Sequence, residues 1–155
     1  MRYATRLGAA IGCAAVILCV APASLLAASS FKKGLYKGTT SQGYTFEFEL
    51  KNIACPRKRH LCIYTPSGGA TSQAYLNMPC PSTGGSTNAY VDLPAIPVPK
   101  SGVIHNSSTL FSLVVVTVKV ARNGKMSGTF EATGTVSDNT SDCTSGVVTF
   151  TASRA

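Results

Sequence analysis

Apolar and polar residues alternate along much of the chain, with the period of two that is typical of β-strands with one buried face. The segment YTFEFELK, residues 44–51, repeats this alternation four times. Its apolar positions share one face, and they are Tyr44, Phe46, Phe48 and Leu50. The C-terminal segment GVVTFTAS, residues 146–153, alternates in the same way. No segment after residue 28 shows a useful helical period, so the pattern predicts an all-β protein.

The segment LVVVTVKVARNGKMSGTFEATGTV, residues 113–136, predicts a β-hairpin of defined register. A two-residue Asn-Gly turn would set apolar positions of one strand opposite polar positions of the other. A three-residue loop ending at Gly124 instead pairs Val116 with Phe130 and Val120 with Met126. A shift of one residue turns every side chain of a strand to the other face, so the apolar pattern selects the three-residue loop. Such a loop ends in a left-handed residue, which suits Gly124.

Further short strands are predicted at residues 35–40, 60–64, 74–78, 89–92 and 109–113. Turn-forming residues dominate the segments between them, at residues 65–73, 79–87, 97–108 and 137–146. The proline-rich residues 93–100 predict an edge or a crossover between sheets, because proline cannot donate to a ladder. This arrangement is typical of an antiparallel β-sandwich, or a flattened barrel, of about eight or nine short strands.

The first segment has the pattern of a secretory signal peptide. Two arginines precede an uncharged apolar stretch that ends in small residues around Ala27 and Ala28. We expect cleavage there, with residues 1–28 as the signal peptide and residues 29–155 as a single β-sandwich domain. The alternative is a retained membrane anchor, because the apolar run approaches the ~20 residues that span a bilayer. Membrane contact is expected only through this segment, and the domain itself is expected to be secreted or extracytoplasmic.

Cysteines follow the signal segment in an even number, which in an exported chain predicts disulfides. They are Cys55, Cys62, Cys80 and Cys143. Three pairings are possible, and we prefer Cys55–Cys62 together with Cys80–Cys143. No C-x-x-C knuckle is present, so the spacing does not favour zinc, and we expect no metal and no cofactor.

Three segments, GLYKGTTSQGYTFEFEL, GKMSGTFEATGTV and CTSGVVTFTASRA, resemble a pattern of small secreted actinobacterial proteins. That pattern runs G-x-Y-x-G-x-T, an aromatic strand, G-x-F-x-x-x-G, then C-x-x-G and a final strand. The resemblance covers the two ends of the domain and hardly touches its middle. Its motifs consist mostly of glycines, read as turn residues, and core aromatics. The resemblance implies a β-sandwich and carries over no activity.

Positive charge is the next distinctive feature of the chain. Of 14 Lys and Arg residues, Arg2 and Arg6 fall in the signal segment, so 12 oppose six Asp and Glu residues, a net charge of +6. Three adjacent cations, Arg57, Lys58 and Arg59, lie between two cysteines. We interpret this segment as a basic loop, either simply solvated or in contact with a polyanion. No aromatic residue interleaves the cations, so specific nucleic-acid binding is not expected.

Candidate catalytic groups are few. Glu47 and Glu49 are adjacent on one strand face, but they alternate with core phenylalanines and are expected to face water. The chain has no G-x-S-x-G elbow and no glycine-rich phosphate loop, so nucleotide chemistry is not expected. His60 and His105, in expected loops or strand ends, complete the candidates for acid–base work.

Glycan binding by aromatic stacking is the better functional hypothesis. The candidate platforms are Tyr36, Tyr64, Tyr75 and Tyr90, for which the alternative is ordinary packing. We therefore expect a non-catalytic binding module whose partner is an anionic cell-surface polymer, a glycan or another protein. The alternatives are an extracellular hydrolase acting on a polymer and a structural or adhesive envelope protein. An exposed aromatic strip would favour glycan binding.

Overall fold

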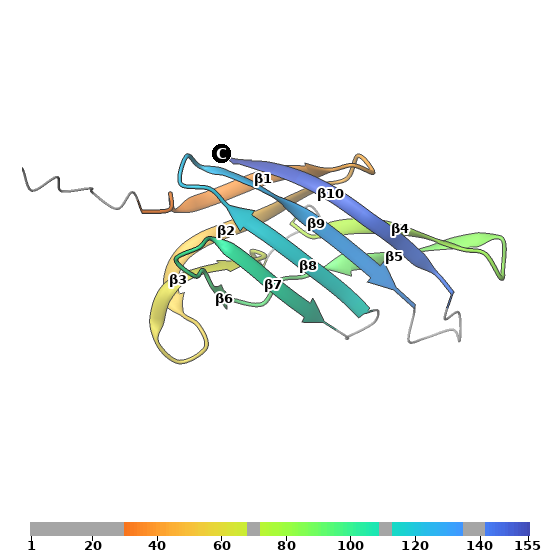
Figure 1. The fold of residues 1–155 in the computed structure, drawn as a ribbon, viewed down its shortest axis with the longest axis horizontal. Coiled ribbons are helices and arrows are strands. Elements are labelled where there is room, and N and C mark those ends of the chain that lie inside the picture. The colour runs from red at the N-terminus through yellow and green to blue at the C-terminus, as the bar shows by residue number, and fades with distance from the viewer. Residues whose placement is uncertain (1–29, 68–71, 109–112, 135–141) are drawn as a thin grey trace, which may run out of the picture.

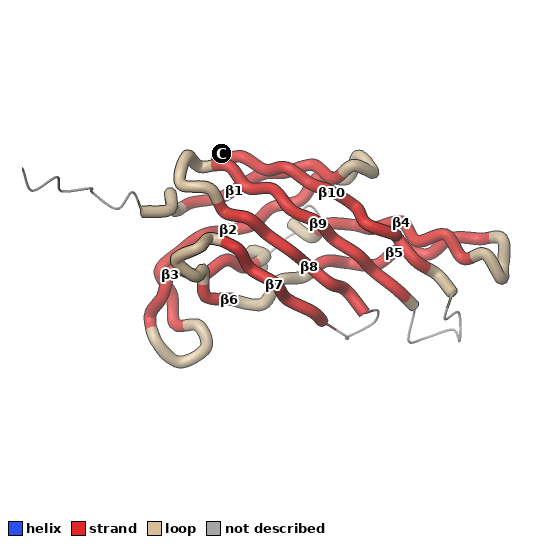
Figure 2. The backbone as a smooth tube through the Cα atoms, in the orientation of Figure 1, coloured by secondary structure: helices blue, strands red, loops and turns tan. Residues whose placement is uncertain are grey.

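The computed structural model describes residues 30–67, 72–108, 113–134 and 142–155, and these form ten β-strands (Figure 1). The strands are β1 Gly34–Thr40, β2 Thr45–Ala54, β3 Arg59–Tyr64, β4 Ala74–Cys80, β5 Gly85–Val91, β6 Ile96–Pro97, β7 Val103–Ser108, β8 Leu113–Val120, β9 Lys125–Thr133 and β10 Thr144–Arg154. The described residues contain no helix (Figure 2), and hence none that could cross a membrane. The all-β prediction is confirmed, whereas the expected signal peptide lies outside the described residues.

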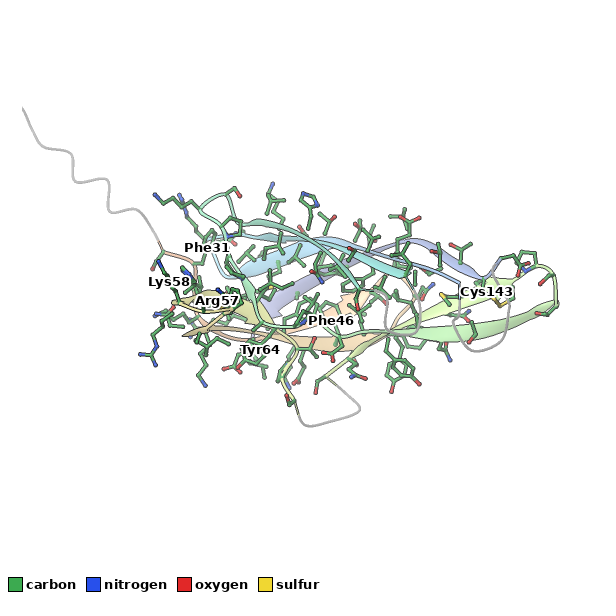
Figure 3. The ribbon with its side chains drawn as sticks, turned by 90° about the horizontal axis from the view of Figure 1, so that it is seen from below. Phe31, Phe46, Arg57, Lys58, Tyr64 and Cys143 are labelled. Carbon is green, nitrogen blue, oxygen red and sulfur yellow. A yellow bond between two sulfur atoms is a disulfide. The ribbon has the colours of Figure 1, made fainter. Side chains whose placement is uncertain are left out.

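Eight of the strands form one curled antiparallel sheet in the order β6-β3-β2-β1-β10-β9-β8-β7. The N-terminal strand β1 pairs with the C-terminal strand β10, where Tyr36 lies opposite Arg154. Strands β4 and β5 form a separate two-stranded sheet. Figure 3 shows that the molecule has two layers, with Phe46 between them.

Aromatic rings from both halves of the large sheet meet in the core. Phe46 and Phe48 come from β2, Phe130 from β9 and Phe150 from β10, and all four are buried. The Phe130 and Phe150 rings stack at 4.4 Å between centroids, and Phe46 meets Phe150 edge-on at 5.1 Å. Such pairs each contribute about 0.5–1.5 kcal/mol beyond their area burial. The alternation predicted from the sequence thus supplies the contact that holds the layers together.

Two strand glycines make room for these rings. Gly38 lies opposite Phe46, and a Cβ there would collide with the Phe46 ring and with Ala152. Gly128 lies opposite Phe150, and a Cβ there would collide with that ring and with the carbonyl oxygen of Thr117. Both glycines belong to the motifs that were read as turn glycines. That reading is wrong at these two positions, because what they provide is space inside the sheet.

The predicted hairpin is confirmed in its register. Val116 lies opposite Phe130 and Val120 opposite Met126. The loop is closed by the N–H of Ala121, which donates to the carbonyl of Lys125 at 2.9 Å. Gly124 ends the loop with φ of +85°, the left-handed conformation that the loop length requires.

Most other expected strands are present with longer ends, and one was missed. Residues 103–108, predicted as part of a turn segment, form the edge strand β7. Only Ile104 of this strand is buried. An edge strand buries few side chains, so its sequence lacks the alternation that would have predicted it. Ile96–Pro97 forms β6 at the other edge, as the proline content predicted. Of the strand expected at residues 109–113, only Leu113 falls within the described residues.

Both disulfides have the preferred pairing. Cys55–Cys62 closes the loop between β2 and β3. Cys80–Cys143 joins the end of β4 to the residue before β10, and so links the small sheet to the large one. Beside it, the Asp142 carboxylate accepts hydrogen bonds from the Ser82 hydroxyl at 2.8 Å and the Ser82 N–H at 2.6 Å. These bonds lower the pKa of Asp142.

Candidate binding surfaces

Three tyrosine rings lie side by side on the outer face of the molecule. Tyr75 of β4 lies directly opposite Tyr90 of β5, with ring centroids 4.8 Å apart. The Tyr44 ring is 6.2 Å from that of Tyr75. Tyr90 is 51% exposed and Tyr44 is 37% exposed, while Tyr75 is half-buried between them. We call these three residues the tyrosine surface.

The tyrosine surface is held from behind by the core. Leu76 and Ala89, which alternate with the tyrosines along β4 and β5, are buried and face the large sheet. Because successive side chains of a strand point to opposite faces, burial of these residues turns Tyr75 and Tyr90 outward. The disulfide at Cys80 anchors the end of the same hairpin.

A side-chain amide places Tyr44 beside the hairpin. Gln42, in the turn between β1 and β2, accepts a hydrogen bond from the N–H of Asn77 at 2.9 Å and donates one to its carbonyl at 3.1 Å. The Gln42 side-chain amide thus bonds to the backbone of β4 as a residue of a neighbouring strand would. Tyr44 was expected to face the core, which is wrong, because it belongs to this turn and precedes the first residue of β2.

Two of the predicted stacking tyrosines lie elsewhere. Tyr36 is 0% exposed and donates its hydroxyl to the Lys32 carbonyl at 2.6 Å, so for this residue the packing alternative holds. It is a core residue, and burial raises its pKa. Tyr64 lies opposite Glu49 and donates its hydroxyl to that carboxylate. Burial and the Glu49 carboxylate together raise the pKa of Tyr64 to about 12.

The basic loop, Arg57 to Arg59, lies at the opposite end of the molecule from Cys143 (Figure 3). Its three cations are exposed. The disulfide Cys55–Cys62 and a hydrogen bond from the Cys55 N–H to the Lys58 carbonyl, at 3.0 Å, hold the loop closed. Within the described part of the chain, no carboxylate lies within ion-pair distance of these cations.

The carboxylates and histidines that were considered for catalysis are placed apart or already engaged. Glu47 pairs with Lys37 at 2.9 Å, and Glu49 lies 3.8 Å from Lys51 besides accepting the Tyr64 hydroxyl. His105 lies 3.1 Å from the Thr117 hydroxyl on an exposed strand face. Among the described residues, His, Cys, Asp and Glu side chains nowhere form a group of three that could hold a metal ion.

The fold and these surfaces define a class of protein, a two-disulfide all-β domain with an exposed aromatic surface. No protein-family model matches the chain, and no curated protein or solved structure is significantly similar to it.

Proposed function

We propose that the protein is an exported, non-catalytic module that binds a glycan through the tyrosine surface. The observation that carries this proposal is the exposure of three adjacent rings on the outer face of a hairpin whose inner face is fixed in the core. The two disulfides support an extracytoplasmic location.

The chemistry of the tyrosine surface suits a sugar. The C–H face of a pyranose is apolar and packs against an aromatic ring, while its hydroxyls need polar partners. Tyrosine offers both a flat ring and a hydroxyl, and it loses little conformational entropy on binding. Asn77 and Asn88 lie opposite each other in the same β-ladder, on the outward face that carries Tyr75 and Tyr90. Their amides can donate to, and accept from, sugar hydroxyls.

An extracellular hydrolase is the alternative of a different class. Glycoside hydrolysis requires two carboxyl groups facing each other across a substrate cleft. Glu47 and Glu49 lie on one strand, and each already has a lysine partner. This arrangement favours a binding module over an enzyme.

The test is equilibrium binding to immobilised xylan, β-glucan and polygalacturonate. We expect Tyr75→Ala and Tyr90→Ala each to weaken binding about tenfold, equivalent to ~1.4 kcal/mol. Tyr90→Phe should retain affinity, because it keeps the ring. The matched control is Tyr64→Phe, which alters a tyrosine outside the tyrosine surface and should bind as the wild type does. Wild-type affinity in the Tyr75→Ala/Tyr90→Ala double variant, or no binding to any of the polymers, would reject the proposal.

Contact of an anionic polymer with the basic loop is a second prediction. It is supported by the exposed cations without carboxylate partners among the described residues. Substitution of Arg57, Lys58 and Arg59 by glutamine should then reduce retention on heparin at low salt, and unchanged retention would contradict the idea.

A further inference from the structure

A second polar surface crosses the large sheet. A hollow of about 710 Å³ lies on its outer face, over strands β1, β8, β9 and β10. The charged residues around it are Lys37, Lys119 and Lys125, and hydroxyl residues including Ser127, Thr151 and Ser153 line it. We call this feature the lysine hollow.

Strand register explains the shape of the lysine hollow. In one row across the sheet, Ser153 of β10 lies between Lys125 of β9 and Lys37 of β1. In the next row, Ser127 lies between Lys119 and Thr151. Neighbouring strands are about 4.8 Å apart, and residues on one face repeat about every 6.8 Å along a strand. Short hydroxyl side chains therefore form the floor, and long lysine side chains stand around it.

The lysine hollow carries uncompensated positive charge. Lys37 pairs with Glu47, but no carboxylate of the described residues lies within ion-pair distance of Lys119 or Lys125. Glu131, on the same face of β9, is four residues beyond Ser127, roughly 14 Å along the strand. The three lysine side chains around the hollow are exposed, so their field is available to a ligand in solution.

The hollow continues along the large sheet from β1 onto β2. A second depression of about 420 Å³ shares Lys37 and Thr39 with it and extends over β2 to Thr45. Thr45 follows directly after Tyr44, a member of the tyrosine surface. The hollow lies on the outer face of the large sheet and the tyrosine surface on the outer face of the small sheet, so a polymer that reaches both would cross the β1–β2 turn beside Tyr44.

The residues that line the lysine hollow favour some anionic ligands over others. Among the described residues, no aromatic side chain lines the lysine hollow, so nucleic-acid bases would have no ring there on which to stack. The hydroxyl floor can exchange hydrogen bonds with sugar hydroxyls, while the lysines attract acid groups. We propose that the glycan is an acidic polysaccharide whose acid groups bind in the lysine hollow. This inference rests on the proposed function of the tyrosine surface and specifies its ligand.

The test compares two immobilised polymers that share a backbone, polygalacturonate and its methyl ester. The wild type should bind the acid form about tenfold more tightly than the ester at ~50 mM salt, and this preference should shrink at ~500 mM salt because the charges are screened. Substitution of Lys37, Lys119 and Lys125 by glutamine should remove the preference and leave binding to the ester unchanged.

A second triple variant controls for net charge. Substitution of Lys33, Lys51 and Lys100 by glutamine removes the same number of charges outside the hollow, and it also includes one ion-paired lysine. We expect this control to bind the acid form within about twofold of the wild type. Equal loss in the two triple variants, or no preference of the wild type for the acid form, would overturn the inference.

The tyrosine variants separate the two proposals. The Tyr75→Ala/Tyr90→Ala variant should weaken binding to both polymers, whereas the hollow variant should affect only the acid form. If the tyrosine variant binds normally and the hollow variant loses the acid form, the tyrosine surface fails and the hollow alone is the anion site. If only the tyrosine variant is affected, the glycan proposal stands and the acidic ligand is rejected.

Discussion

The Tyr64 phenol holds its proton more tightly than a free tyrosine side chain does. Its hydroxyl donates to Glu49 on the neighbouring strand, and its pKa rises to about 12 from an ordinary value of 10.0. The folded state therefore holds this proton more tightly than the unfolded state does. The resulting stabilisation is fully present below pH 10 and is lost as the pH rises from 10 to about 12.

The raised pKa of Tyr64 can be tested directly. An ultraviolet titration of the wild type minus that of Tyr64→Phe should show one phenol with a midpoint of about 12. The free energy of unfolding should fall less steeply above pH 10 in the variant, because phenylalanine has no proton to lose. A difference titration with its midpoint near 10 would show that Glu49 does not hold the hydroxyl in solution.

At the scale of elements, the hairpin of β8 and β9 depends on the conformation of a single loop residue. Its register follows from alternation in both strands, and Gly124 closes it with φ of +85°. A side chain with a Cβ is strained in this conformation, while asparagine tolerates it better than alanine does.

Gly124→Ala should therefore lower the free energy of unfolding by about 1–2 kcal/mol, and Gly124→Asn by less. Urea denaturation measures both. Gly85→Ala is the matched control, because Gly85 does not have positive φ and the nearest atom to its added Cβ would be the Thr83 hydroxyl at 3.5 Å. The control should stay within about 0.5 kcal/mol of the wild type. Equal stability of the alanine and asparagine variants at position 124 would argue against backbone strain as the cause.

At the scale of the whole molecule, the two disulfides differ in how much chain they close. Cys55 and Cys62 are 7 residues apart, whereas Cys80 and Cys143 are 63 apart and join the end of β4 in the small sheet to the residue before β10 in the large one. All four cysteines are buried, so replacement by alanine should cost similar packing at each pair. The difference between two double variants then reports mainly on the entropy of the unfolded chain.

Cys80→Ala/Cys143→Ala should lose about 4 kcal/mol of stability, and Cys55→Ala/Cys62→Ala about 2.5 kcal/mol. Urea denaturation without reductant measures the two values. The first variant also removes the covalent link between the small sheet and the large one, so it should weaken glycan binding more than the second does. A larger loss of stability from the Cys55–Cys62 pair would contradict the chain-entropy account.

The sequence by itself determined the fold class, the register of one hairpin and the core phenylalanines of β2. Alternation with period two states which side of a strand is buried, and this information is local. The sequence alone also placed three cations in one loop, because Arg57 to Arg59 are contiguous. The alternation did not reveal edge strand β7, because a strand at the edge of a sheet buries few side chains.

Only the tertiary structure decided which outward faces become neighbours. The lysine hollow joins Lys37 to Ser153, which lie at opposite ends of the domain sequence, and the tyrosine surface joins Tyr44 to Tyr90. It also separated Tyr36, sealed in the core, from the exposed tyrosines. Alternation cannot predict these outcomes, because strand order is chosen by the packing of the whole apolar interior, and outward side chains follow wherever their strands are placed.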